Sequence, residues 1–190
     1  MYKLTLASQS PRRYAFLQNM GLKFKVFNAD IDESILKGES VSSYVRRLAT
    51  QKAHFALNLN QDNVVIGADT VISLGDEILG KPKDRLDAKM MIKKLSGTTH
   101  CVHTGVCVCN IDKSFTIETV TKVTFAPLSD SLIDTYVATG ECDDKSGSYA
   151  LQGIGAMLIQ SVEGSVSSVV GLPVCQTREL LEKFNIYPGM

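Results

Sequence analysis

The residues with the clearest chemical potential stand near the start of the chain, in a Leu-Ala-Ser-Gln-Ser-Pro-Arg-Arg segment. Ser10 suits a helix N-cap and Pro11 suits the first helical position, so a helix is predicted to begin here. Arg12 and Arg13 fall in its first turn, where positive charge opposes the helix macrodipole. An anion at this end would meet backbone amides, two guanidinium groups and the hydroxyls of Ser8 and Ser10. Nucleotide phosphates are the candidate ligand; a capped helix with solvated arginines is the alternative, and the local pattern by itself does not choose between them.

An acidic residue interrupts a strongly apolar run further along the chain. Asp69 follows the apolar residues 64–68 and precedes Val71 and Ile72. A carboxylate buried in a strand is costly without a partner, so Asp69 is either a functional acid, or a structural residue that hydrogen-bonds a nearby loop or ends the strand. The small residues Gly67 and Ala68 are expected to leave room for a ligand to approach the backbone.

Two lysines stand where their direction is constrained. Lys52 lies on the apolar stripe of a predicted helix, and Lys81 lies between Gly80 and Pro82 in a predicted turn. Each can hold an ammonium group toward phosphates. The alternatives are a stem that reaches solvent at the helix edge and an ordinary exposed loop lysine. The sequence has no Walker A loop and no Gly-x-Gly-x-x-Gly motif, so neither a P-loop NTPase nor a dinucleotide binder is supported.

Further short motifs follow in a fixed order over nearly the whole chain. They are Gly-Ala-Asp-Thr-Val (67–71), Gly-Lys-Pro (80–82), Ser-Gly with His100 and Thr-Gly (96–105), Asp-Lys-Ser-Gly-Ser-Tyr with Gln-Gly (144–153), and Val-Gly-Leu-Pro (170–173). Together with the N-terminal segment they resemble the Maf family of nucleoside triphosphate pyrophosphatases. The resemblance implies hydrolysis of a nucleoside triphosphate to the monophosphate and pyrophosphate, with a divalent metal ion.

The resemblance also implies roles for individual residues. Asp69 matches the acid that is proposed to accept a proton from the attacking water, and Glu33 matches an acidic residue that would join Asp69 as a metal ligand. Oxygen ligands and a triphosphate suit Mg²⁺ or Mn²⁺. Attack on the α-phosphorus also needs cations on the leaving pyrophosphate. The expected phosphate-binding residues are Ser8, Ser10, Arg13, Lys52 and Lys81.

Three positions bear on the choice of base. The family subgroup that acts on thymidine and uridine triphosphates has Arg after Ser-Pro, Thr after the catalytic Asp, and Gln in the later Gln-Gly block. This chain has Arg12, Thr70 and Gln152, which predicts dTTP and UTP as substrates and leaves modified pyrimidine nucleotides open. The amide of Gln152 can pair with the O4 and N3–H edge of uracil or thymine. The alternatives are a 7-methylguanosine triphosphate pyrophosphatase, marked by an aromatic residue, Gln and Glu at these positions, and a nucleotide-binding regulator of septum formation.

Composition limits the classes of partner. The chain of 190 residues has 20 basic and 20 acidic side chains, which argues against polymeric nucleic acid and against an RNA-binding module. Its apolar runs are too short for a membrane span, and its N-terminus lacks the order of a signal peptide. Five cysteines without a disulfide framework predict a reducing, cytoplasmic location. A nucleoside triphosphate is the expected partner, and a homodimer stays open.

The histidines and cysteines are expected to bind no metal. Cys107 and Cys109 share one face of a predicted strand without a fitting partner spacing and are interpreted as small core residues. His54 has no ligand four residues away on its helix. His100 and His103 lie on opposite faces of a strand, and His100 is expected to make a structural hydrogen bond.

Helical and strand patterns alternate along the chain, which favours an α/β fold, and residues 1–190 are interpreted as a single Maf-like domain. Helices are predicted over 11–20, 40–59 (with Phe55 and Leu59 on the apolar face), 84–97, 129–140 and 173–184. Strands are predicted over 4–7, 64–74, 77–79, 101–109, 115–125 and 156–162. The resemblance implies an elongated two-lobed mixed sheet with peripheral helices and a central cleft, similar to the inosine triphosphate pyrophosphatases.

Overall fold

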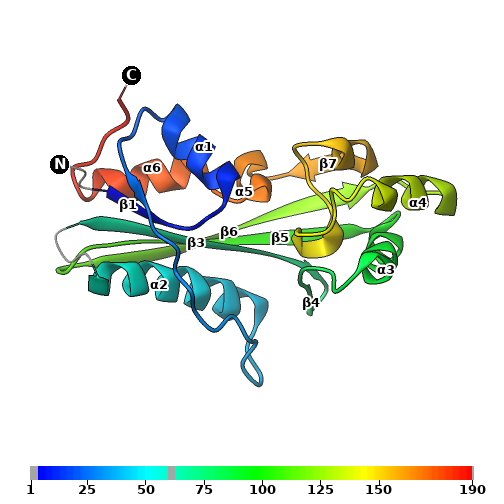
Figure 1. Cartoon of the computed structure of the whole chain (residues 1–190), viewed down its shortest axis with the longest axis horizontal. Coiled ribbons are helices and arrows are strands. Elements are labelled where there is room, and N and C mark those ends of the chain that lie inside the picture. The colour runs from blue at the N-terminus through cyan, green and yellow to red at the C-terminus, as the bar shows by residue number, and fades with distance from the viewer. Residues whose placement is uncertain (1–3, 60–62, 190) are drawn as a thin grey trace. The chain divides into compact units, whose positions relative to one another are not determined.

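A computed structural model describes residues 4–59 and 63–189, and it confirms the predicted mixed α/β architecture (Figure 1). Seven strands form one sheet in the order β2-β1-β3-β5-β6-β7, with β4 paired to β3. Strand β1 runs parallel to β2 and β3, whereas the pairs β3–β4 and β6–β7 are antiparallel. The strands are β1 (Leu4–Ala7), β2 (Lys25–Val26), β3 (Val64–Leu74), β4 (Glu77–Leu79), β5 (Thr99–Cys109), β6 (Ser114–Phe125) and β7 (Ile159–Glu163).

The helices complete two compact units, and β3, β5 and β6 each contribute residues to both. Unit 1 comprises residues 1–69, 104–119 and 171–190, and unit 2 comprises residues 70–103 and 120–170. Unit 1 contains α1 (Pro11–Asn19), α2 (Val41–Leu59) and α6 (Val174–Glu182). Unit 2 contains α3 (Arg85–Leu95), α4 (Asp130–Ala138), α5 (Val166–Val170) and the 3-10 helices η1 (Ser146–Ser148) and η2 (Ile154–Leu158). No helix in the described ranges is long and apolar enough to cross a membrane.

Strand alternation divides the core of unit 1 into two layers. Ile66 and Ala68 of β3 pack with Leu17 of α1 and Leu180 of α6, whereas Val65 packs on the other face with Ala53 of α2. Figure 1 shows the same division, with α1 and α6 on one face of the strands and α2 on the other. Because side chains alternate along a strand, Asp69 shares the α2 face with Val65 and Gly67.

Two glycines let α2 lie close against the sheet. A Cβ at Gly67 would stand 2.3 Å from the Ala49 carbonyl oxygen, and one at Gly105 would stand 2.5 Å from the Val45 carbonyl oxygen. The expectation that Gly67 leaves room for a ligand is therefore wrong, because the backbone of α2 fills that space. The close approach brings the Lys52 side chain of α2 to the end of the apolar run of β3.

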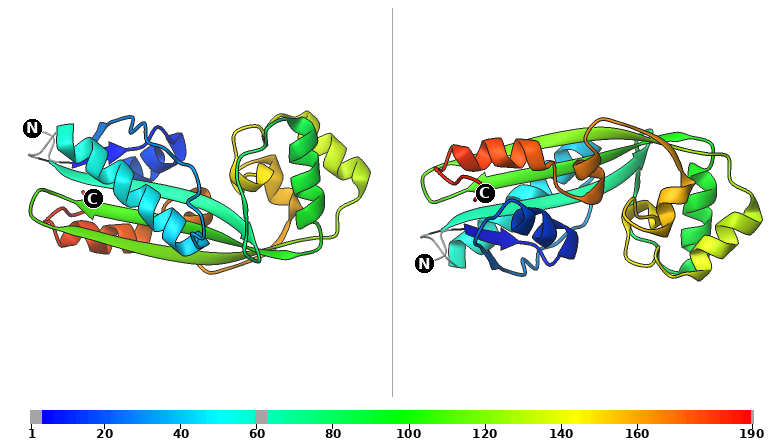
Figure 2. Two further views of the ribbon diagram at one scale, coloured as in Figure 1. Left: turned by 90° about the horizontal axis from the view of Figure 1, so that it is seen from below. Right: turned by 90° about the horizontal axis from the view of Figure 1, so that it is seen from above.

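Unit 2 has its own core beneath α3 and α4. Ile92 of α3, Ile133 and Tyr136 of α4, and Phe125 of β6 are fully buried in one cluster. Figure 2 shows α3 and α4 lying beside each other, and the helices are in contact. The side chain of Asp84 caps α3 by accepting the Asp87 amide at 2.8 Å, as the sequence predicts for a helix starting near 84.

Two local predictions differ from the structure. The strand predicted over 156–162 begins only at Ile159, because residues 154–158 form the 3-10 helix η2. Phe55 and Leu59 do not face the core and are 40% and 63% exposed. The buried face of α2 instead carries Val45, Leu48 and Leu57 together with the small residues Ala49, Ala53 and Ala56, and the alanines lie where the helix backbone approaches the sheet most closely.

Candidate active site

The centre of the candidate site is a lysine held between two carboxylates, all within unit 1. The Lys52 ammonium nitrogen lies 2.6 Å from Oδ1 of Asp69 and 2.6 Å from Oε1 of Glu33. Lys52 and Asp69 are buried, whereas half of the Glu33 side chain is exposed. The structure thus brings together three predicted site residues that stand on α2, on β3 and in the loop before α2.

Burial and charge act in opposite directions on Asp69. Burial raises the pKa of its carboxyl group, and the positive charges of Lys52 and Arg13 oppose that rise. The net pKa stays above the ordinary value, so the carboxylate is a stronger base than an exposed aspartate. A base with such a pKa, held on a strand by a buried lysine, is suited to proton abstraction.

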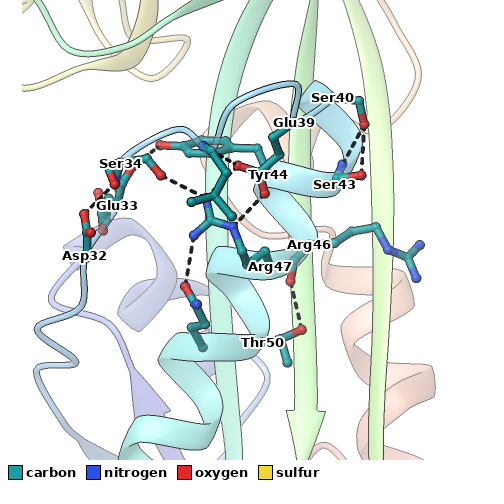
Figure 3. Close-up of polar contacts among 12 residues, drawn as sticks. Asp32, Glu33, Ser34, Glu39, Ser40, Ser43, Tyr44, Arg46, Arg47 and Thr50 are labelled. Carbon is teal, nitrogen blue, oxygen red and sulfur yellow. Dashed lines mark hydrogen bonds and ion pairs between the residues drawn. The ribbon is translucent and has the colours of Figure 1, made fainter.

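The loop that carries Glu33 is tied down by residues of α2 (Figure 3). The Arg47 guanidinium makes a bidentate ion pair with Glu39, at 2.6 and 2.7 Å, and donates to the Ser34 carbonyl at 3.0 Å. The Tyr44 hydroxyl donates to the Glu33 backbone carbonyl at 3.0 Å. Sequence reasoning missed Arg47 and Tyr44, because no short motif links them to a loop 8 to 13 residues upstream.

The N-terminal segment forms the predicted cap and buries one arginine. Ser10 accepts the Arg13 amide at 3.4 Å, and Pro11 is the first residue of α1. Arg13 Nε donates to the Gly171 carbonyl at 2.8 Å, and its Nη1 donates to the Ser8 hydroxyl at 3.1 Å. The last motif, Val-Gly-Leu-Pro, therefore fixes the direction of Arg13. Burial lowers the pKa of this guanidinium, while Asp69 opposes that shift.

The remaining predicted residues are distributed over both units. Arg12 is half-buried on α1 in unit 1. Thr70, next to Asp69 along β3, is half-buried in unit 2, where Lys81 and Gln152 are exposed. The predicted convergence of Arg12, Thr70 and Gln152 around one base stays a prediction.

Unit 2 connects the motif blocks of its own two loops. The Gly147 amide donates to the Gly80 carbonyl at 3.0 Å, which joins the Gly-Lys-Pro block to the Asp-Lys-Ser-Gly block. Glu141 accepts the amides of Ile154 and Gly155 at 2.8 and 2.7 Å. Glu141 thus caps the start of η2, two residues after Gln152.

His100 has the structural role predicted for it. Its Nε2 lies 2.7 Å from the Tyr149 hydroxyl, and its ring packs edge-on against Phe125 and Tyr149. Burial lowers the pKa of His100 to about 4, so the ring is neutral near pH 7.

The carboxylates of the site fit the divalent ion that the resemblance implies. Glu33 and Asp69 offer oxygen donors that approach a single cationic atom, and hard divalent ions prefer such donors. Two protein oxygens are few for Mg²⁺, but this ion commonly completes its shell with water and substrate phosphates. The exposed side of Glu33 gives such ligands access.

The fold and these motifs are those of a nucleotide-hydrolysing class of α/β proteins, and comparison with known proteins identifies the family. The model of the Maf-like protein family matches residues 3–184, so the chain belongs to the Maf family. It is similar to the dTTP/UTP pyrophosphatase of Anaeromyxobacter dehalogenans strain 2CP-C, with 48% identity covering 95% of this chain and 93% of the relative. The dTTP/UTP pyrophosphatase of Bacillus anthracis is 43% identical over 98% of this chain and 97% of its own length.

One solved structure supports the fold assignment. The Ham1 protein of Staphylococcus aureus superposes with a TM-score of 0.50 and 14% identity, covering 82% of this chain and 79% of that protein. At this identity the likeness concerns the fold alone, and it agrees with the predicted fold class.

Proposed function

We propose that this chain hydrolyses dTTP and UTP to the nucleoside monophosphate and pyrophosphate in the cytoplasm. The observation that carries the proposal is the buried Asp69, whose Oδ1 lies 2.6 Å from Lys52 beside Glu33, in a Maf family member. Relatives of 43–48% identity bear the name dTTP/UTP pyrophosphatase, which favours pyrimidine over 7-methylguanosine nucleotides. The five cysteines are free thiols, as suits a reducing compartment.

The roles of the residues follow from their surroundings. Asp69 accepts the proton of the water that attacks the α-phosphorus, because burial keeps its pKa above that of an exposed carboxyl group. Lys52 and Arg13 keep the carboxylate ionised until that step. A divalent ion held by Glu33 and Asp69 would supply positive charge to the triphosphate. Ser8, Ser10 and Lys81 are proposed to bind the phosphates.

Base selectivity is assigned to Arg12, Thr70 and Gln152. Gln152 offers both a donor and an acceptor, which match the O4 and N3–H edge of uracil and thymine. Thr70 stands next to the proposed base Asp69 on β3. These three side chains are proposed to favour UTP and dTTP over purine nucleotides.

The direct test is a product assay with an Asp69→Asn variant and a matched control. Wild-type protein with Mg²⁺ or Mn²⁺ should release pyrophosphate and monophosphate from UTP, and excess chelator should stop the reaction. Asp69→Asn should lose about 10²–10⁴-fold in kcat, whereas Asp112→Asn, in the exposed turn after β5, should not. Release of orthophosphate, or near-normal turnover by Asp69→Asn, would contradict the mechanism.

A further inference from the structure

A histidine and two cysteines converge on the α2 face of the sheet, within unit 1. One ligand atom from each of His54, Cys107 and Cys109 lies within 4.8 Å of the other two. His54 comes from α2, and both cysteines come from β5. The spacing along each element by itself predicts no metal site, whereas the fold brings His54 of one element to the two cysteines of the other.

The backbone explains why these side chains meet. Cys107 and Cys109 are two residues apart on β5, so both point to the same face of the strand. They pack in the cluster that contains Ala53 and Ala56 of α2. The small alanines and the contact at Gly105 hold α2 close to β5, which brings His54 within reach of both sulfur atoms.

We propose that His54, Cys107 and Cys109 form a binding site for a zinc ion, separate from the proposed nucleotide site. Thiolate and imidazole are the ligands that Zn²⁺ prefers, and three protein ligands plus one exchangeable group are a common zinc set. Tetrahedral zinc with Zn–S bonds of about 2.3 Å needs ligand atoms roughly 3.8 Å apart. The observed spread within 4.8 Å requires only small side-chain movements to reach that arrangement.

The charges and neighbouring groups also suit zinc. Two thiolates and a neutral imidazole together balance the charge of Zn²⁺, so the loaded site carries no net charge where the cysteines are buried. Metal binding would deprotonate both cysteines and release their protons to solvent.

A fourth group and access from solvent are present. The Ser114 hydroxyl lies 3.4 Å from His54 Nε2 and 3.4 Å from Cys107 Sγ, beside the position that the ion would occupy. His54 also lines an open pocket of about 420 Å³ together with Asp30 and Asp32. Ser114 is exposed and His54 is half-buried, so solvent reaches the edge of the cluster.

Cobalt substitution tests the site independently of nucleotide hydrolysis. Reduced protein is titrated with Co²⁺ in excess Mg²⁺, which saturates oxygen ligands without occupying thiolates. We expect one equivalent of Co²⁺ to produce thiolate-to-cobalt charge-transfer absorption, and one equivalent of Zn²⁺ to abolish it. Absence of this absorption would overturn the proposal, while leaving the proposed pyrophosphatase activity untouched.

Variants assign the ligands. Cys107→Ser and His54→Gln should each weaken Zn²⁺ binding at least tenfold in competition with a chromophoric chelator, and Cys107→Ser should reduce the charge-transfer intensity. Cys101→Ser, on the same strand but outside the cluster, should behave as wild type. His54 is only partly buried, so His54→Gln keeps the test decisive if Cys107→Ser fails to fold. Unchanged affinity in His54→Gln would refute the site.

Discussion

Replacing Lys52 by methionine should expose the electrostatic balance of the proposed active site. Methionine keeps an unbranched stem on the inner face of α2 but removes the charge that contacts Asp69 and Glu33 at 2.6 Å. Asp69 is only 9% exposed, so the substitution would leave its carboxylate buried without the ammonium group that contacts it. Breaking a buried ion pair in this way typically costs about 3–5 kcal/mol of stability. We expect the lower end, because Arg13 also contributes positive charge at Asp69.

The sign of the pH dependence follows from the same contacts. Without Lys52 the pKa of Asp69 rises further, because the nearest charge that opposes the effect of burial is gone. The stability deficit of Lys52→Met is therefore largest at alkaline pH, where Asp69 is ionised, and shrinks as pH falls through the raised pKa. Lys52→Met combined with Asp69→Asn should recover most of the lost stability at neutral pH, but no activity.

Urea unfolding monitored by circular dichroism, without nucleotide and in chelator, measures these differences at about pH 5 and about pH 8. Lys94→Met is the matched control, since Lys94 pairs with Glu77 at the exposed surface and such pairs contribute about 0–1 kcal/mol. A Lys52→Met variant as stable as Lys94→Met at pH 8 would refute the argument. So would a double variant that recovers no stability.

Three further outcomes are expected. Wild-type protein should lose up to about 3 kcal/mol of stability as pH falls from 6.5 to about 4, because the folded state keeps His100 neutral while the unfolded chain protonates it. His100→Gln should remove this pH-dependent loss. A variant whose urea midpoint depends on pH as in wild type would contradict the argument. Arg47→Ala should loosen the loop that carries Glu33 and raise KM for UTP several-fold at a given metal concentration, whereas Arg46→Ala, one residue away and exposed, should not. Gln152→Glu should lower kcat/KM for UTP relative to 7-methylguanosine triphosphate in a competition assay; an unchanged ratio would remove Gln152 from base recognition.

Local patterns in the sequence determined the elements and the candidate residues. The cap of α1 at Ser10, the strand over 64–74 and the start of α3 after Asp84 agree with the structure, because side-chain periodicity and capping act within a few residues. The ordered motifs also predicted the family that the comparisons confirm.

Long-range packing decided the surroundings of those residues. Arg13 is fixed by the Gly171 carbonyl, 158 residues away, and the space at Gly67 is filled by α2 rather than by a ligand. The close packing of α2 on the sheet also brings His54 to Cys107. Periodicity specifies which face of an element is apolar, but the distance between two packed elements depends on residues from both. For that reason the sequence alone predicted the chemistry of Asp69 and Lys52, and only the tertiary structure determined the contacts that control their charge.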